Sequence, residues 1–153
     1  DKGYAVSELM VDGKSVGAVK SYTFENVRQS HTIEVSFAEI AFVDVPAGSY
    51  YEDAVIWAVE NGITQGTAAA HFSPNGVCTR EQAVTFLRRA AGSPAPKASA
   101  MPFTDVKPGS YCYEAVIWAV ENGIAKGTTE PTFSPNAHCT RAQIVTFLWR
   151  GRQ

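Results

Sequence analysis

The chain has 153 residues, of which 13 are Lys or Arg and 15 are Asp or Glu, so its formal net charge is −2. This balance disfavours nucleic-acid binding, which uses a basic surface, and gives no polybasic attraction to an anionic bilayer. A hydrophobic share of 45% indicates a folded chain. The longest apolar run, from Ala54 to Val59, is far shorter than the ~20 residues that a membrane helix needs. We therefore expect no nucleic-acid partner and no membrane insertion.

The first forty residues show the two-residue alternation of apolar and polar side chains that is typical of β-strands. Residues 5–11 predict a strand that enters a tight turn at Asp12-Gly13, and residues 22–24 and 32–37 predict two further strands. Three such short strands bury too little apolar surface to be confidently stable alone. We expect a small β-meander over residues 1–40 that is part of a larger β domain, or that leans on the helical part or on another chain.

Residues 42–89 and 103–150 are two copies of one segment, which align without a gap about 61 residues apart, with about 31 of 48 positions identical. The ten residues AVIWAVENGI recur letter for letter at 54–63 and 115–124. Between the copies, residues 92–101 contain two prolines and predict an exposed linker. We expect a partial β-strand domain at 1–40, a first repeat at 41–91, this linker, and a second repeat at 102–153.

Each copy predicts a helix, a loop and a second helix. In the first copy, Ser49 and Glu52 have the spacing of a capping box, and Gly62 is expected to end the helix. Six consecutive apolar residues cover the whole circumference of this helix, so it should be buried on most sides. The second copy keeps Ser110 but has Tyr113 in place of the glutamate, so we expect its cap to be weaker.

The second helix of each copy is predicted to start at a capping box, formed by Thr79 with Gln82 and by Thr140 with Gln143. Its apolar residues then recur with the helical period and form one stripe. The predicted fold class is therefore mostly α, with two helix-loop-helix repeats packed as part of a helical bundle. The N-terminal strands make it α+β overall.

Arg80 and Arg141 occupy matched positions in the first turn of the second helix, where the helix dipole disfavours a cation by ~0.3–1 kcal/mol. A guanidinium beside exposed N–H groups at a helix start suits a carboxylate or a phosphate. The alternative is a structural bridge from each arginine to Asp44 or Asp105. The two interpretations are compatible, and the residues alone leave both open.

Three further matched pairs are candidate carbohydrate contacts: Trp57 and Trp118, Tyr50 and Tyr111, and Asp44 and Asp105. Each tryptophan either packs in the core or forms a groove wall, where its ring stacks on a sugar or its N–H donates a hydrogen bond, and the tyrosines carry the same two interpretations. The aspartates can cap helices, form bridges or accept hydrogen bonds from sugar hydroxyls. For them we favour a structural role.

The three cysteines are too few for a disulfide scaffold. Cys78 and Cys139 precede the second-helix caps, where buried, inert thiols are expected, while a disulfide between Cys112 and Cys139 is the alternative. His71, His138 and the thiols lack the spacing of metal ligands, so no metal site is expected. Because no catalytic or phosphate-binding motif is present, we expect neither an enzyme nor a cofactor.

The order of Phe-x-Asp-Val, Ala-Val-x-Trp-Ala, Asn-Gly-Ile, Phe-Ser-Pro-Asn and Thr-Arg-x-Gln resembles the S-layer homology repeat of bacterial cell-surface proteins. Both copies carry it, from Phe42 to Arg150. Residues 1–40 resemble the latter half of a bacterial surface β-repeat of the kind related to internalin B-repeats.

The resemblance implies a non-catalytic module that holds a secreted protein on the wall of a Gram-positive-type bacterium, at the cell surface or in the S-layer. It implies a secondary cell-wall polysaccharide as partner, often bearing a pyruvate ketal, whose anionic sugar meets the arginine of a Thr-Arg-Ala-Glu motif. Thr79-Arg80-Glu81-Gln82 and Thr140-Arg141-Ala142-Gln143 occupy that place. Gln in place of Glu can still cap the helix, but it removes a negative charge near the arginine.

A second departure concerns the number of repeats, because the family generally uses three around a pseudo-threefold axis and this chain has two. We expect either a third copy in a part of the protein that is not present here, or a homo-oligomer in which two chains complete the three-repeat bundle. The competing interpretation is a protein–protein assembly module that binds no glycan.

Overall fold

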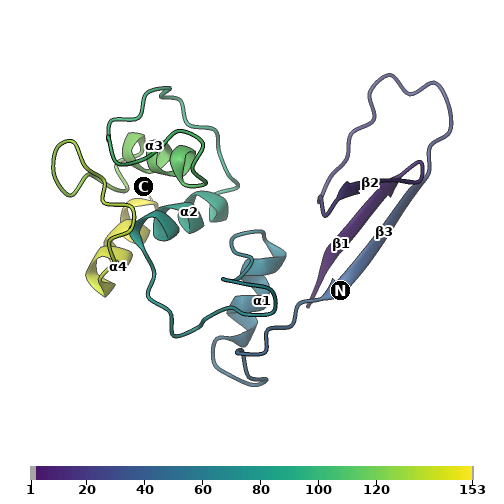
Figure 1. The fold of residues 1–153 in the computed structure, drawn as a ribbon, viewed down its shortest axis with the longest axis horizontal. Coiled ribbons are helices and arrows are strands. Elements are labelled where there is room, and N and C mark those ends of the chain that lie inside the picture. Colours follow the sequence, from purple (N-terminus) through teal and green to yellow (C-terminus); the bar gives the residue numbers. More distant parts are fainter. Residues whose placement is uncertain (1–2, 153) are drawn as a thin grey trace. The chain divides into compact units, whose positions relative to one another are not determined.

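The computed structural model describes residues 3–152, which form a three-stranded antiparallel sheet followed by four helices (Figure 1). The elements are β1 (Tyr4–Val11), β2 (Lys14–Gly17), β3 (Ile33–Glu39), α1 (Glu52–Glu60), α2 (Arg80–Ala90), α3 (Tyr113–Glu121) and α4 (Arg141–Arg150). The predicted fold class, mostly helical and α+β overall, is confirmed. Within residues 3–152, no helix has the length and apolar character needed to span a bilayer.

The sheet is antiparallel with the order β2-β1-β3, so β1 is its central strand. In the meander that we expected, β1 would lie at an edge of the sheet. The turn at Asp12-Gly13 is confirmed, because Val11 pairs with Lys14. The strand predicted at residues 22–24 is wrong. The tight turn returns the residues after Gly13 directly onto β1, so that edge is occupied before the chain reaches Tyr22. Tyr22 and Phe24 pack against each other in the following loop, with ring centroids 4.9 Å apart.

The chain divides into two compact units, and this division does not follow the repeats. The first unit contains the residues up to Asn61 together with Gln65–Phe72, and the second contains Gly62–Thr64 together with the residues from Ser73 onward. Helix α1 therefore belongs to the unit that holds the sheet, whereas α2, α3 and α4 form the other unit.

In the first unit, α1 contacts β1 and is tied to the chain's N-terminal part through Glu60. The Glu60 carboxylate accepts a hydrogen bond from the Gly3 backbone at 2.6 Å, and the Lys20 ammonium group donates to the Glu60 backbone carbonyl. Val55 is buried, but Trp57 on the same helix has 55% of its surface exposed. Only part of this apolar helix is therefore covered.

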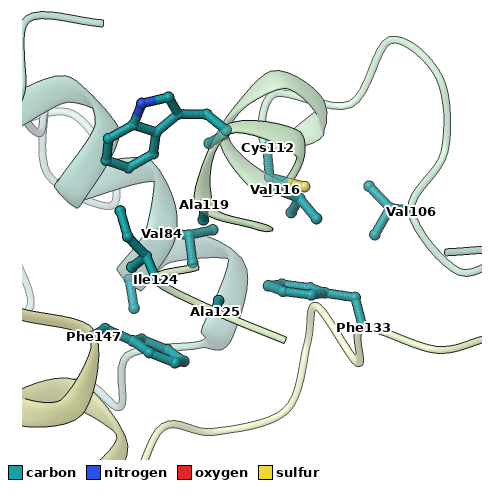
Figure 2. Packing of buried hydrophobic residues seen from close by; sticks show 12 residues of the cluster. Val84, Val106, Cys112, Val116, Ala119, Ile124, Ala125, Phe133 and Phe147 are labelled. Carbon is teal, nitrogen blue, oxygen red and sulfur yellow. The ribbon is translucent and has the colours of Figure 1, made fainter. Parts of the chain in front are cut away.

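The second unit has the main core of the chain, where α2 packs against α3 and also contacts α4. Figure 2 shows Val84 of α2, Val116 and Ala119 of α3, Phe147 of α4 and Phe133 of the loop converging on one apolar cluster. Val84, Val116, Ala119 and Phe133 have no exposed surface. The prediction that the first helix of a repeat is buried on most sides is thus confirmed for α3.

The helix starts follow the prediction at α2 and α4 but not at α1. Thr79 and Thr140 each form a complete capping box with the glutamine three residues later. Helix α1 begins at Glu52 without a side-chain cap, and among the described residues the buried Ser49 hydroxyl has no hydrogen-bond partner. The Glu52 carboxylate instead accepts from the Gly48 backbone at 2.6 Å, so the predicted box at Ser49 is wrong. Helix α3 likewise has no side-chain cap.

Candidate functional site

The two matched aspartates hold the loops that lead towards the second helices. Asp105 accepts hydrogen bonds from the backbone of Phe133 and of Ser134, at 2.8 and 2.7 Å. Asp44 accepts the equivalent bond from the Phe72 backbone at 2.9 Å. Each aspartate thus fixes backbone N–H groups of its own repeat.

Arg80 is buried, with 4% of its surface exposed, and its guanidinium is bound to the second repeat. Its Nε donates to the Phe133 carbonyl at 2.9 Å and its Nη2 donates to the Lys126 carbonyl at 2.8 Å. The guanidinium also lies over the Phe133 ring, 4.7 Å from the centroid. Burial lowers the pKa of this guanidinium, and the nearby Asp105 carboxylate opposes that shift. Arg80 therefore fixes the loop of the second repeat rather than projecting freely at a ligand.

A cleft of about 340 Å³ lies beside α4 in the second unit. Its lining consists of Arg80 and Lys126 together with five residues of α4, namely Ala142, Gln143, Thr146, Phe147 and Arg150. Within the described residues this lining contains three cationic side chains and no acidic one. Lys126 is exposed and Arg150 is half-buried. The three cations of the lining attract an anion, and none of the lining residues carries a carboxylate. Asp105, which lies near Arg80, offsets part of this attraction.

Sequence reasoning missed Lys126 and Arg150 as candidate ligand contacts. The sequence did contain a signal for Arg150, because Arg89 occupies the same position in the first copy. In the structure the two arginines also make equivalent contacts. Arg89 donates to the Ile63 carbonyl at 3.0 Å, and Arg150 donates to the Ile124 carbonyl at 3.4 Å. Lys126 carried no such signal, because its counterpart in the first repeat is Gln65.

The other predicted contacts are dispersed. Arg141 lies on the surface at the start of α4, and no hydrogen bond or ion pair of its side chain is found in the part of the chain that the structure describes. Tyr50 has 97% of its surface exposed and Tyr111 has 57%. Burial of its hydroxyl end, together with a hydrogen bond to Glu81, raises the pKa of Tyr111. None of these three side chains lines the cleft beside α4.

The two tryptophans differ in burial although they stand in identical ten-residue segments. Trp118 has 8% of its surface exposed and belongs to the core of the second unit. This burial favours the packing interpretation for Trp118. Trp57 has 55% of its surface exposed and keeps a ring face available for contact.

All three cysteines are free thiols in this structure, so the alternative of a disulfide between Cys112 and Cys139 is not formed here. The buried Cys112 thiol donates to the Glu81 carboxylate at 3.4 Å and contacts the Ser110 hydroxyl. Cys139 instead lies opposite Cys78, since its backbone N–H donates to the Cys78 carbonyl at 2.9 Å. Across residues 3–152, no group of three or more His, Cys, Asp or Glu side chains is arranged to hold a metal ion.

Comparison with known proteins identifies the duplicated segment. The family model described as the S-layer homology domain matches residues 41–84 and 102–145. The chain is 33% identical to the surface-layer 125 kDa protein of Lysinibacillus sphaericus over 99 residues, which cover 65% of the chain and 8% of that protein. It is 32% identical to the S-layer protein sap of Bacillus anthracis over 115 residues, covering 74% of the chain and 14% of that protein.

The chain is also similar to an enzyme, the endoglucanase of Bacillus sp. strain KSM-635, with 31% identity over 127 residues. This match covers 83% of the chain but 13% of the endoglucanase. The chain thus corresponds to a small part of the length of each of these relatives. Because the family model matches both copies of the repeat over more than half of the chain, the chain belongs to the S-layer homology domain family.

Proposed function

We propose that this chain anchors a secreted protein by binding an anionic polysaccharide of the bacterial cell wall, of the kind that carries a pyruvate ketal. Membership of the S-layer homology family makes the chain a cell-surface anchoring module of bacteria. Relatives that are themselves S-layer proteins support this location. The proposal concerns the ligand, and the single observation that carries it is the cationic cleft beside α4.

The lining of the cleft suits an acidic sugar in three ways. The exposed Lys126 ammonium group and the Arg150 guanidinium can form charge-assisted hydrogen bonds with a sugar carboxylate. Ala142, which is exposed, offers an apolar surface to the C–H face of a pyranose ring. Gln143 uses its side-chain oxygen to accept from the Thr140 backbone at 2.9 Å, which leaves its amide N–H groups for a sugar hydroxyl.

Arg80 has a different role in this proposal. Its donors are directed at two backbone carbonyls, so it sets the position of Lys126 and forms the floor of the cleft. We propose Lys126 and Arg150 as the residues that meet the anionic group. Replacing Lys126 should weaken binding without disturbing the core, because this residue is exposed. Arg150→Ala also removes the hydrogen bond to the Ile124 carbonyl, so the stability of this variant is measured together with its binding.

Sedimentation of purified wall polysaccharide with the chain tests the proposal. Lys126→Ala and Arg150→Ala should each lower the association constant about tenfold or more, which is the loss expected for one charge-assisted contact. Lys107→Ala is the matched control, since Lys107 is exposed, lies in the same unit and does not line the cleft. Unchanged binding by the Lys126→Ala, Arg150→Ala double variant would exclude the cleft as the binding site.

The chemistry of the anion can be tested on the polysaccharide itself. Mild acid removes a pyruvate ketal and with it the carboxylate, while the glycan backbone is retained. We expect the treated polymer to bind much more weakly, and binding to the untreated polymer to weaken as salt screens the charges. Equal binding of both polymers at every salt concentration would overturn the anionic part of the proposal.

The remaining predicted contacts stay proposals of lower rank. Arg141, Tyr50, Tyr111 and Trp57 are exposed and can form a separate contact surface for the polymer, whereas Trp118, Asp44 and Asp105 have the structural contacts described above. The similarity of residues 1–40 to an internalin B-repeat-like surface domain also stays a prediction.

One observation favours the alternative function, assembly with another protein copy. Val145, Leu148 and Trp149 form an apolar stripe on α4 with 50–61% of each side chain exposed. Their counterparts on α2 are Val84, Leu87 and Arg88, and this face of α2 lies against α3: Val84 is fully buried and Arg88 binds Glu114 at 2.7 Å. We propose that a second copy covers the stripe and thereby completes the bundle.

Light scattering at several protein concentrations tests this assembly. Val145→Asp should reduce any concentration-dependent association, whereas Val77→Asp should leave it unchanged. Val77 is a matched control because it is 60% exposed, against 61% for Val145, and lies outside the stripe. A monomer at all concentrations would remove the assembly proposal, and polysaccharide binding would be unaffected by that result.

A further inference from the structure

The segments that precede α2 and α4 run side by side in opposite directions. The Cys139 backbone donates to the Cys78 carbonyl at 2.9 Å, and the Arg80 backbone donates to the Ala137 carbonyl at 2.9 Å. Between these two bonds, Thr79 and His138 form an antiparallel bridge. Cys78 and Cys139 are therefore directly opposite each other in a short antiparallel pair, although about 60 residues separate them in the chain.

This backbone arrangement meets the Cα-distance requirement of a disulfide. Directly opposed residues of an antiparallel pair have Cα atoms about 4.5–5.5 Å apart and side chains on the same face. Disulfides form where the Cα atoms are roughly 4.4–6.8 Å apart. Burial, with a further contribution from the nearby Cys139, raises the pKa of the Cys78 thiol.

Accessibility distinguishes these two cysteines from the third. Cys78 and Cys139 are partly exposed, so a small reagent can reach their sulfur atoms. Cys112 is 1% exposed and its thiol is directed at Glu81. An oxidant should therefore reach the matched pair first.

We propose that Cys78 and Cys139 are a modification site, at which oxidation forms a disulfide that joins the start of α2 to the start of α4. This inference rests on the proposed function in one respect. The proposed function places the chain outside the cell, where the surroundings are oxidising enough for a disulfide to persist. The oxidant is a low-molecular-weight disulfide. The thiolate of one cysteine attacks it and releases one small thiol, and the second cysteine then displaces the other small thiol. One protein S–S bond forms, the reagent's S–S bond is reduced to two thiols, and the two protein protons are transferred to the released thiolates.

The cross-link would act on the two helix starts that border the cationic cleft. Cys78 is two residues before Arg80, which fixes the Lys126 loop, and Cys139 is three residues before Ala142 on the lining of the cleft. The bond therefore holds the two walls in their observed register. Because it closes a loop of about 60 residues, it should also restrict the unfolded chain strongly.

Oxidised and reduced glutathione mixtures provide the probe, applied to the whole chain. Proteolytic digestion without reduction, followed by mass spectrometry, should recover one peptide pair linked through Cys78 and Cys139. Thermal unfolding of the oxidised chain should shift upward by roughly 5–15 °C, and reductant should reverse the shift. Cys78→Ser and Cys139→Ser should each abolish the shift, whereas Cys112→Ser should retain it even if its baseline stability is lower.

Three outcomes would overturn the proposal. These are a link between Cys112 and Cys139, a covalent dimer on a non-reducing gel, and stable glutathione adducts on both cysteines without ring closure. None of these measurements involves polysaccharide. Failure of the disulfide is therefore separate from failure of the proposed function, which the Lys126→Ala and Arg150→Ala variants report.

Discussion

The Arg80 guanidinium lies 4.7 Å from the centroid of the Phe133 ring and donates a hydrogen bond to the backbone carbonyl of that same residue. One side chain thus joins the start of α2, in the first repeat, to the loop of the second repeat. The sequence suggested Arg80 as a ligand contact, but in the structure its side chain holds the core together. Its sequence twin, Arg141, is exposed.

Replacing these two arginines should therefore have unequal effects on stability. Arg80→Ala should lower the free energy of unfolding by about 2–4 kcal/mol, because it leaves the buried Phe133 carbonyl and the half-buried Lys126 carbonyl without their charged donor and removes the contact with the Phe133 ring. Arg141→Ala should change it by no more than ~0.5 kcal/mol, as is usual for a surface residue. Urea unfolding followed by circular dichroism measures both, and equal losses would contradict the assigned environments.

The duplicated tryptophans give a second matched comparison. Trp118→Ala should cost about 3–5 kcal/mol, since it opens a cavity in the core of the second unit. Trp57→Ala should cost less than ~1.5 kcal/mol, because over half of that side chain is already in water. Both values come from denaturant unfolding of dilute protein. If Trp57→Ala were as costly as Trp118→Ala, α1 would have to be covered in solution.

The capping boxes predict a third pattern. Thr79→Ala and Thr140→Ala should each cost about 1 kcal/mol, because each removes the side-chain acceptor of a backbone N–H in the first turn. Ser49→Ala is the control and should be neutral or slightly stabilising, since its buried hydroxyl makes no hydrogen bond among the described residues. Thermal unfolding of the three variants tests this order. A large loss for Ser49→Ala would restore the cap predicted from the sequence.

Alkaline pH should weaken the second unit through Cys112. Burial, with a further contribution from Glu81, raises the pKa of the Cys112 thiol above its ordinary value of 9.0. The folded state thus favours the protonated thiol, so this stabilisation is complete below the thiol pKa of the unfolded chain and is lost as pH rises through the higher folded pKa. The free energy of unfolding should fall more steeply above about pH 9 in the wild type than in Cys112→Ala. Parallel curves for the two proteins would contradict this.

Local features of the fold could be predicted from the sequence because their causes are local. The boxes at Thr79 and Thr140 and the helix end at Gly62, whose φ is 67°, each depend on a few neighbouring residues. Tyr22 and Phe24 misled the strand prediction, because alternation cannot tell a strand from a loop whose rings pack on each other.

The different environments of the two identical segments could not be predicted, because AVIWAVENGI carries the same information twice. Trp118 is buried since α3 packs with α2 and the rest of the second unit, and nothing within the segment records that neighbour. In the sequence, Lys126 likewise could not be distinguished from an ordinary surface lysine. Its place in the cleft depends on Arg80, which precedes it by 46 residues.

The cleft is formed by both repeats, as the hydrogen bond from Arg80 to the Lys126 carbonyl shows. The first repeat contributes Arg80, and the second repeat contributes the other residues of the lining. With this cleft as the proposed glycan site, the number of glycans bound should equal the number of neighbouring repeat pairs rather than the number of repeats. A linear array would carry one cleft fewer than it has copies, and a closed ring would carry as many as it has copies. Lengthening such an anchor by one unit would therefore add a binding position only where the new unit docks against an old one.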